Sequence, residues 1–323
     1  MKEERLSDED CLRRALILAR KGLGHTRPNP AVGAVIAKDG RLLGEGWHRR
    51  AGGDHAEVVA IKDALRRGVD SLSGASIYVT LEPCSRPGRV GACTDAIAAA
   101  GLSRVVYACS DPNPKNRGRA ARVLAKRGVC CSRWRGAGDI VSQAQSLVRA
   151  FAKHVTTGLP YVTVKLAMSL DGKICDNRGD AKWVSSAAAR RTTGRLRECV
   201  DAIMVGGETV RRDNPSLLSH GRRNDDLVRV VVSRSGNLPS DAQIFTDGKN
   251  PTLVFPDAAE AMRALGEQGL THILCEGGLS LATSLAEQGF VDEWIAVLAP
   301  KVIGTRPIAD ATPIGGVACL QDW

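Results

Sequence analysis

The stretch His55-Ala56-Glu57, followed by Pro83-Cys84 and then Cys93, gives the strongest indication of fold and chemistry in this 323-residue chain. It supplies one imidazole and two thiols, which can hold zinc and leave a fourth position open for water. Zinc lowers the pKa of such a water to about 7. Because Glu57 is not needed as a ligand, it is free to carry protons to a substrate nitrogen. This combination is typical of zinc-dependent hydrolytic deaminases.

Taken singly, these residues have ordinary explanations. A histidine beside a glutamate is usually a surface or capping pair, and a buried cysteine usually acts as a small hydrophobic side chain. Their positions argue against coincidence. His55 opens an apolar-periodic run that predicts a helix, Cys84 follows the strand-like run 75–81, and Cys93 precedes the helical run 95–100. All three are therefore expected at strand-to-helix junctions, where helix N-termini favour thiolates.

Turn and capping signals organise the rest of the first half. Ser7-Asp8-Glu9-Asp10 predicts the start of a helix that ends near Gly22. A hairpin is expected where the runs 32–37 and 42–46 flank Lys38-Asp39-Gly40-Arg41, because Asp-Gly favours a tight turn. The further elements expected are a strand at 104–109, a helix at 117–127 and a short strand at 129–132. These elements predict a three-layer α/β module in which helices cover a mixed sheet.

The spacing between the two cysteines bears on the substrate. Deaminases that act on nucleic acid carry P-C-x-x-C, whereas eight residues, 85–92, separate Cys84 from Cys93 here. This insert places Arg86 and Arg89 on a loop bent by Gly and Pro. Such a loop is either an ordinary solvated loop or a holder for a substrate phosphate, which arginine pairs with well.

The first 150 residues resemble the deaminase half of the bifunctional riboflavin biosynthesis deaminase/reductase family. The motifs that carry the resemblance are Thr26-Arg27-Pro28-Asn29-Pro30-Ala31-Val32-Gly33, Gly46-Trp47-His48, His55-Ala56-Glu57, Leu81-Glu82-Pro83-Cys84-Ser85, Gly88-Arg89, Cys93 and Asp111-Pro112-Asn113-Pro114. The resemblance implies that His55, Cys84 and Cys93 are the zinc ligands and that Glu57 is the catalytic proton carrier.

The same resemblance implies a set of substrate contacts. Asn29, His48 and Arg89 fall where family members contact the pyrimidine ribosyl phosphate. Asparagine offers both a donor and an acceptor to a ring edge, and arginine pairs with phosphate. The loop departs from the family pattern, because Arg86 stands where a histidine is usual and Gly91-Ala92 replaces Pro-Pro.

A second module is expected after a helix near 141–156 and the sequence Gly158-Leu159-Pro160. We expect a zinc-dependent deaminase domain over residues 1–150 and a second domain over 151–323. The strands expected there are 161–167, 202–206, 229–233, 251–255, 271–275 and 294–299, and the helices are 186–198, 257–269 and 279–289. Their alternation predicts a doubly wound sheet with a ligand cleft at the strand ends.

Two glycine turns follow strands of this half, at 205–209 and 274–280. The second opens a helix and offers bare backbone N–H groups to a pyrophosphate. Neither is a G-x-G-x-x-G motif, so each is by itself weak evidence of dinucleotide binding.

The second half resembles the reductase half of the same family. The motifs that carry this resemblance are Lys165-Leu166-Ala167-Met168-Ser169-Leu170-Asp171-Gly172-Lys173, Trp183, Arg197, Asp201-Ala202-Ile203, Thr209-Val210, Asp213-Asn214-Pro215-Ser216-Leu217, Glu276-Gly277-Gly278 and Val291-Asp292-Glu293. The resemblance implies a fold like dihydrofolate reductase and NADPH as the hydride donor. The cofactor contacts that it implies are Ala167, Trp183, Thr209, Asp213 and Gly278. The substrate contacts that it implies are Arg197, Leu217 and Glu276. Arginine pairs well with a 2′-phosphate, and the candidates for that contact are Arg211, Arg212 and Arg234.

Three departures concern this reductase half. Ala181 and His220 stand where many members place a serine and an arginine that hold the substrate phosphate. The sequence ends at Trp323, about two dozen residues before the usual closing strand of the family. Since a lost hydrogen bond to a charged group costs on the order of 1.5–3 kcal/mol, these changes predict a reductase that is weak or that handles its substrate differently.

Charge and composition restrict the class of partner. Residues 1–150 carry 26 Lys and Arg against 15 Asp and Glu, a net charge of +11, while residues 151–323 carry 19 against 20, a net charge of −1. A basic deaminase module suits a nucleic acid, but aromatic residues make up only 4% of the chain and leave few stacking platforms. A small phosphorylated pyrimidine is equally drawn to positive charge. Nucleic acid is therefore the less favoured partner.

Targeting and assembly are predicted from further features. No apolar h-region follows Met1, and no run approaches the roughly 18 apolar residues of a membrane span. Ten cysteines are scattered through strand-like and helix-like runs, which fits a reducing compartment. We expect a cytoplasmic protein that forms a homo-oligomer, a dimer or tetramer.

The sequence thus predicts an enzyme of riboflavin biosynthesis. It would deaminate 2,5-diamino-6-ribosylamino-4(3H)-pyrimidinone 5′-phosphate with Zn²⁺ and reduce the ribosyl side chain to ribityl with NADPH. Two alternatives remain open at this point. One is a descendant in which only the deaminase half is active, and the other is a deaminase of nucleic-acid bases.

Overall fold

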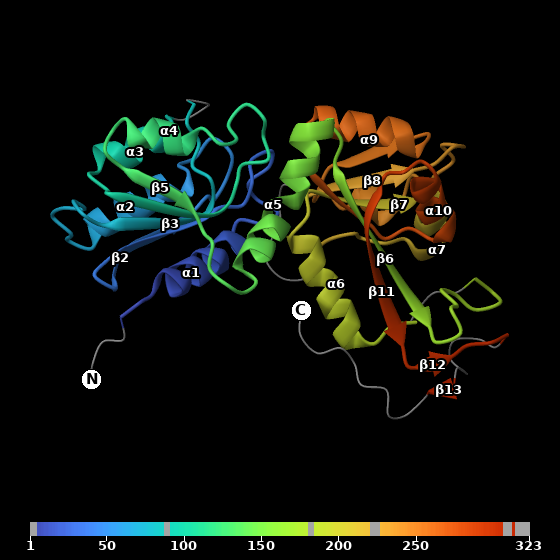
Figure 1. Cartoon of the computed structure of the whole chain (residues 1–323). Coiled ribbons are helices and arrows are strands. Elements are labelled where there is room, and N and C mark those ends of the chain that lie inside the picture. Colours follow the sequence, from blue (N-terminus) through green and yellow to red (C-terminus); the bar gives the residue numbers. More distant parts are fainter. Residues whose placement is uncertain (1–4, 87–90, 180–183, 220–226, 306–311, 314–323) are drawn as a thin grey trace. The chain divides into compact units, whose positions relative to one another are not determined.

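The computed structural model describes residues 5–86, 91–179, 184–219, 227–305 and 312–313. The chain divides into two compact units, Met1–Pro160 with Gly266–Thr271 and Tyr161–Leu265 with His272–Trp323 (Figure 1). Within the described ranges, no helix is both long enough and apolar enough to cross a membrane. The division of function between residues 150 and 151 stays a prediction.

A five-stranded mixed sheet forms the centre of the first unit. Its strands are β1 (Gly33–Lys38), β2 (Arg41–Trp47), β3 (Ser76–Leu81), β4 (Arg104–Cys109) and β5 (Cys130–Arg133). They lie in the order β2-β1-β3-β4-β5. β1 runs antiparallel to β2 and β3, whereas β3, β4 and β5 are parallel to one another. The carboxyl ends of β3 and β4 therefore meet at one edge of the sheet.

The hairpin between β1 and β2 turns where the sequence predicts it. Asp39 and Gly40 both have left-handed backbones, with φ of 53° and 78°. Two consecutive left-handed residues match the twist of the flanking strands, which is why Asp-Gly is favoured at this turn. The predicted hairpin is confirmed.

Five helices cover the two faces of this sheet (Figure 1). They are α1 (Asp8–Arg20), α2 (Ala56–Arg66), α3 (Cys93–Ala99), α4 (Ala120–Ala125) and α5 (Ile140–Thr157). Helices α1 and α5 pack on the face that carries Val35 and Ala37, and α2, α3 and α4 pack on the face that carries Ala34 and Ile36. This alternation along β1 gives the three-layer arrangement that the sequence predicts.

Local signals fix the start of α1. The Ser7 side chain accepts a hydrogen bond from the Asp10 backbone N–H at 3.1 Å, and the Asp10 carboxylate accepts one from the Ser7 N–H at 2.9 Å. This reciprocal pair is a capping box, and three acidic residues in the first turn complement the helix dipole.

Glycines let the helices approach the sheet closely. A Cβ added to Gly33 would lie 2.1 Å from the carbonyl oxygen of Ala15 in α1. A Cβ added to Gly44 or Gly46 would lie 2.4 Å or 2.6 Å from backbone atoms of Ala60 in α2. The backbones of both helices therefore touch the hairpin directly, and any larger residue at these positions would push them away.

The second unit contains a six-stranded parallel sheet. Its strands are β6 (Tyr161–Ser169), β7 (Ala202–Gly206), β8 (Val228–Val232), β9 (Thr252–Phe255), β10 (His272–Cys275) and β11 (Val291–Ala299). They lie in the order β11-β6-β10-β7-β8-β9, and every pair is parallel. A separate two-stranded ribbon pairs β12 (Lys301–Val302) with β13 (Thr312–Pro313).

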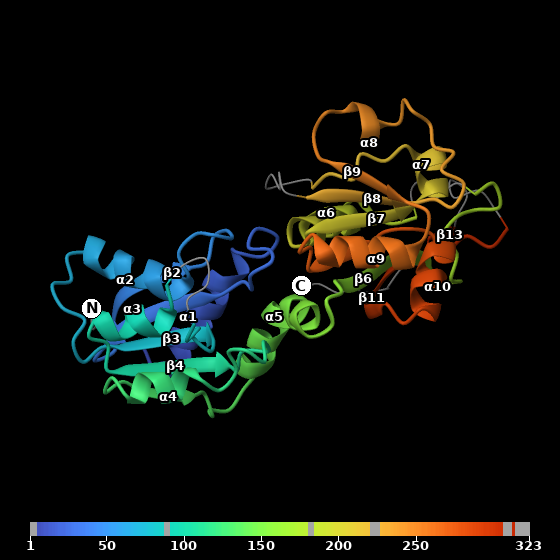
Figure 2. The same cartoon turned by 90° about the horizontal axis from the view of Figure 1, so that it is seen from above.

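Helices connect and flank these strands (Figure 2). They are α6 (Ala187–Glu198), α7 (Gly207–Asp213), α8 (Gln243–Thr246), α9 (Ala258–Glu267) and α10 (Leu279–Glu287). Residues 202–205 of β7 are all buried, as expected for a parallel strand with both faces covered. The predicted α/β fold of both units is confirmed. The short helices α7 and α8 were not predicted, because seven and four residues are too few to show a helical period.

The close contact at Gly33 gives a test of this packing. We expect Gly33→Ala to lower the free energy of unfolding by about 1–3 kcal/mol, because the new methyl group must displace the Ala15 backbone. Chemical unfolding followed by circular dichroism measures the change. Gly91→Ala is the control, since the added Cβ meets nothing within 4 Å. Equal unfolding midpoints for the two variants would contradict the proposed packing.

Candidate active site

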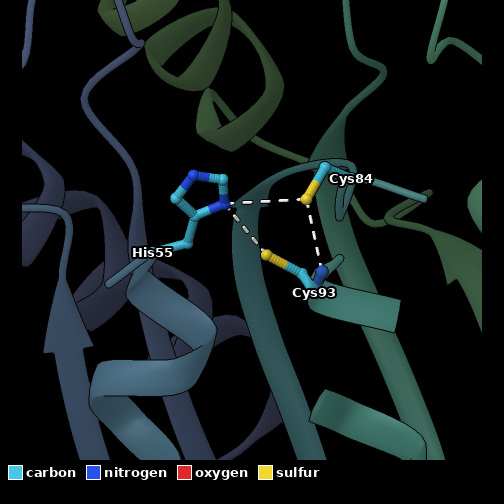
Figure 3. A group of neighbouring side chains, drawn as sticks. All are labelled: His55, Cys84 and Cys93. Carbon is cyan, nitrogen blue, oxygen red and sulfur yellow. Dashed lines mark hydrogen bonds between the residues drawn. The ribbon is translucent and has the colours of Figure 1, made fainter. Parts of the chain in front are cut away.

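Three donor side chains converge at the edge of the first sheet (Figure 3). His55 is the N-cap residue of α2, Cys84 follows the end of β3, and Cys93 is the first residue of α3. His55 Nδ1 lies 3.1 Å from Cys93 Sγ and 3.6 Å from Cys84 Sγ. The structure thus brings together all three predicted metal ligands, and Nδ1 is the histidine nitrogen that faces the sulfurs.

The hydrogen bonds and pKa shifts within this cluster favour the binding of a cation. The backbone N–H of Cys93 donates to Cys84 Sγ at 3.2 Å. Hydrogen bonding from the Cys93 thiol, together with that from His55, lowers the pKa of Cys84 to about 4. The same contact raises the pKa of Cys93, and the Cys84 sulfur raises the pKa of His55. The hydrogen bonds to Cys84 thus favour its thiolate form, which is the form that binds a metal ion.

The donor set fits zinc. Tetrahedral zinc with nitrogen and sulfur ligands places the donor atoms about 3.5 Å from one another, and the ligand atoms here lie within 4.8 Å of one another. His55 makes no capping hydrogen bond to its own helix, so its ring is free to act as a ligand. Three protein ligands leave a position for water, as in catalytic zinc sites.

Glu57 lies in the first turn of α2, beside this cluster. It is only 3% exposed, and burial raises the pKa of its carboxyl group. A raised pKa suits a group that must take up a proton and release it again near neutral pH. Glu57 therefore has the burial and the position that a proton carrier needs.

Asn29 and His48 form a second polar pair near the cluster. His48 Nδ1 lies 2.9 Å from the carbonyl oxygen of Asp54, which can only accept, so Nδ1 carries the proton. Burial lowers the pKa of His48, and the neutral ring leaves Nε2 as an acceptor for Asn29 Nδ2 at 3.1 Å. This bond fixes the Asn29 amide, and its oxygen remains available to a ligand.

These groups line one cavity of about 410 Å³, a volume suited to a small molecule. The cavity wall includes Asn29, His48, His55, Glu57, Cys84 and Arg86. It also includes five polar residues to which the sequence reasoning gave no role, Glu82, Asp111, Asn113, Lys115 and Asn116. Four of these, Glu82, Asp111, Asn113 and Lys115, lie in or directly after motifs quoted for the family resemblance. Their position in these motifs is the sequence feature that could have indicated a role in the site. The predicted substrate contact Arg89 lies outside the described residues.

Most of the predicted reductase residues lie at the carboxyl-end edge of the second sheet. Ala167 is near the end of β6, Thr209 and Asp213 are in α7 directly after β7, and Gly278 is the N-cap of α10 after β10. Since β6, β10 and β7 are adjacent and parallel, their carboxyl ends share this edge. Trp183, Ala181 and His220 lie outside the described residues.

Arg197 and Glu276 form a half-buried ion pair beside these strand ends. Arg197 Nε and Nη2 donate to the two oxygens of Glu276 at 2.6 Å and 3.0 Å. Arg197 Nη1 donates to the carbonyl oxygen of Leu218 at 2.9 Å, next to Leu217, which has a left-handed backbone with φ of 51°. Arg197 is therefore bonded to Glu276 directly and to the residue that follows Leu217, which places the three predicted substrate contacts of this half near one another.

The sequence reasoning missed Lys165, which lies on β6 near this pair. Burial lowers the pKa of Lys165, and the charges of Glu276 and Arg197 act on it in opposite directions. Two of the arginines considered for a 2′-phosphate already have partners, because Arg211 and Arg212 both pair with Glu208. Lys165 is the first residue of a motif quoted for the resemblance. Sequence periodicity predicts only that it lies in a strand and gives it no functional role.

The chain matches two family models. Residues 6–109 match the cytidine and deoxycytidylate deaminase zinc-binding region, and residues 160–318 match the RibD C-terminal domain. Fold and site together define a zinc-dependent deaminase joined to a reductase.

Known relatives cover almost the whole chain. The riboflavin biosynthesis protein RibD of Escherichia coli is 36% identical, with 93% of this chain and 89% of that protein covered. RibD of Actinobacillus pleuropneumoniae is 35% identical, with 98% and 89% covered. The chain therefore belongs to the RibD family, whose members are bifunctional deaminases and reductases of riboflavin biosynthesis with zinc and NADPH as cofactors.

Solved structures agree with this assignment. A diaminohydroxyphosphoribosylaminopyrimidine deaminase/5-amino-6-(5-phosphoribosylamino)uracil reductase from Thermotoga maritima superposes with a TM-score of 0.85 at 33% identity, with 93% of this chain and 88% of that chain covered. RibD of Acinetobacter baumannii gives a TM-score of 0.78 at 32% identity, with 94% and 90% covered.

Removal of one ligand tests the metal centre. We expect Cys93→Ala to reduce bound zinc from about one ion per chain to nearly none, because two remaining ligands cannot hold the ion against a chelator. Metal analysis after dialysis against a weak chelator measures this. Cys11→Ala is the control, since Cys11 is equally buried but lies in α1 within the apolar core. Full zinc retention by Cys93→Ala would show that the ligand set is different.

Proposed function

We propose that the first unit deaminates 2,5-diamino-6-ribosylamino-4(3H)-pyrimidinone 5′-phosphate at its exocyclic 2-amino group. The observation that carries this proposal is the position of buried Glu57 next to the His55, Cys84 and Cys93 cluster, on the wall of a cavity of about 410 Å³. The solved Thermotoga relative is named for a deaminase of this type of pyrimidine.

Each side chain then has a defined task. His55, Cys84 and Cys93 would hold the zinc, which would supply the nucleophile by lowering the pKa of a bound water molecule to about 7. Glu57 would carry the two protons of the attacking water in turn, the first to the ring nitrogen and the second to the amino group, which leaves as ammonia while the water oxygen becomes the carbonyl oxygen. Asn29, held by His48, presents its amide oxygen to the donors of the pyrimidine edge. The buried carboxyl group is suited to this relay because its raised pKa makes both protonation states accessible.

The phosphate of this substrate is expected at the basic rim of the cavity. Arg86 and Lys115 both line the cavity and are exposed, and Arg89 belongs to the same insert as Arg86. An arginine binds phosphate with two parallel hydrogen bonds, and a lysine adds a point charge. Arg86 can therefore replace the histidine that is usual at this position.

For the second unit we propose reduction of the ribosyl side chain by NADPH. The start of α10 at Gly278 and the segment from Gly206 to Thr209 offer backbone N–H groups to the pyrophosphate. Ala167 and Asp213 lie at the same sheet edge and are the next proposed cofactor contacts. Trp183 is proposed as a further contact from the family resemblance alone. Arg197, Leu217 and Glu276 hold the substrate, and Lys165 lies within reach of their charges. We further expect a homo-oligomer, a dimer or tetramer, in the cytoplasm.

Product analysis by mass tests both activities. Zinc-loaded protein should convert the diaminopyrimidine to the deaminated ribosyl compound without NADPH, and to the ribityl compound with NADPH. If the reaction stops at the ribosyl compound in the presence of NADPH, the reductase proposal is wrong. If the starting compound remains unchanged, the deaminase proposal is wrong.

The role of Glu57 has its own test. We expect Glu57→Gln to lower the deamination rate by about 10²–10⁴-fold, because an amide cannot carry the proton. Bound zinc should stay near one ion per chain, since Glu57 is not in the ligand set. Reduction of separately supplied deaminated substrate is the internal control and should not change. A Glu57→Gln variant that deaminates at the normal rate would eliminate this mechanism.

A further inference from the structure

Asn116 is a buried amide on the wall of the deaminase cavity, and it makes hydrogen bonds at both ends. It is 7% exposed. Its Nδ2 donates to Asp111 Oδ2 at 2.6 Å. Its Oδ1 accepts from the backbone N–H of Ser85 at 2.9 Å and from Ser85 Oγ at 3.1 Å. Asn116 therefore links the residue directly after Cys84 to the segment that follows β4.

Glu82, two residues before Cys84, is attached to the same segment. Its carboxylate is 2% exposed and accepts hydrogen bonds from three backbone N–H groups. These come from Asp111 at 3.2 Å, Gly118 at 3.0 Å and Ala120 at 3.2 Å. Cys84 is thus held from both sides, by Glu82 before it and by Ser85 after it.

An asparagine at this position matches the donors and acceptors of both neighbours. Asp111 accepts at both oxygens, from the Asn113 N–H at 2.8 Å and from Asn116, so it needs a donor opposite it. Ser85 presents two donors and needs an acceptor. Aspartate at 116 would face the Asp111 carboxylate without a hydrogen to donate, and leucine would satisfy neither neighbour.

We propose that Asn116 is a positioning residue of the deaminase, which sets the placement of the Cys84 sulfur through Ser85. This inference rests on the proposed zinc-dependent deaminase function. Asn116 touches neither the cluster of ligands nor Glu57 through a hydrogen bond, so it acts through the chain at 84–85. Partners that orient metal ligands commonly change metal affinity or activity by 10- to 100-fold when they are replaced.

The test compares Asn116→Leu and Asn116→Asp with the unchanged full-length protein. Zinc affinity is measured by competition with a chromogenic chelator. The second measurement is the visible spectrum of protein loaded with Co²⁺, which reports the thiolate geometry. Gln143→Leu is the control, because Gln143 is a surface amide on α5 that bonds to Arg20 and Asp139. Circular dichroism sets a temperature at which every variant is folded.

We expect both Asn116 variants to bind zinc about 10- to 100-fold more weakly and to show a shifted thiolate-to-cobalt band at saturating Co²⁺. Gln143→Leu should match the unchanged protein in both respects. Zinc affinity within twofold of normal together with an unchanged cobalt spectrum would overturn the proposal, even if deamination were slower. Failure of the unchanged protein to deaminate would instead refute the proposed function and leave the zinc and cobalt readings interpretable.

Discussion

The contact between α2 and the β1–β2 hairpin is the constraint on which the first site depends. Gly44 and Gly46 let the α2 backbone at Ala60 lie directly on β2. This sets the start of α2, which carries His55 and Glu57, close to the sheet edge from which Cys84 emerges. Larger side chains at the two glycines would push α2 away from β2 and would disturb the ligand atoms, which lie within 4.8 Å of one another. Gly44 and Gly46 therefore help to set the geometry of the ligand cluster, although neither residue is a ligand.

The parallel pairing of β3 and β4 supplies the other half of the site. Because these neighbours run in the same direction, the chain after β3 and the chain after β4 leave the sheet side by side. The first segment contains Cys84, and the second contains Asp111 and Asn116. The same holds in the second unit, where β6, β10 and β7 are adjacent and parallel. Ala167 near the end of β6, Glu276 after β10 and the start of α7 after β7 therefore lie at one edge of the sheet. In both units, polar groups from distant parts of the chain meet because parallel strands end together.

The sequence predicts much of this architecture, for identifiable reasons. The Asp39-Gly40 turn and the helix start at Ser7 are local signals, and the structure confirms them. The metal ligands could be named because imidazole and thiol side chains in this spacing have few other uses together. The roles of Asn116 and Lys165 could not be predicted from the residues adjacent to them in the sequence. Their importance depends on partners such as Ser85 and Glu276, 31 and 111 residues away in the numbering, which only the fold brings near.

The cavity adds information on the partner that net charge alone does not give. The first 150 residues carry a net charge of +11, which suits a nucleic acid as well as a small phosphate ester. However, the groups proposed for the chemistry line a cavity of about 410 Å³, and only two cations of the described residues, Arg86 and Lys115, belong to its wall. A single-stranded nucleic acid needs an extended basic groove with aromatic platforms, whereas one phosphate needs only a few cations at the rim of a small cavity. Local charge at the site, rather than net charge, therefore favours the small phosphorylated pyrimidine.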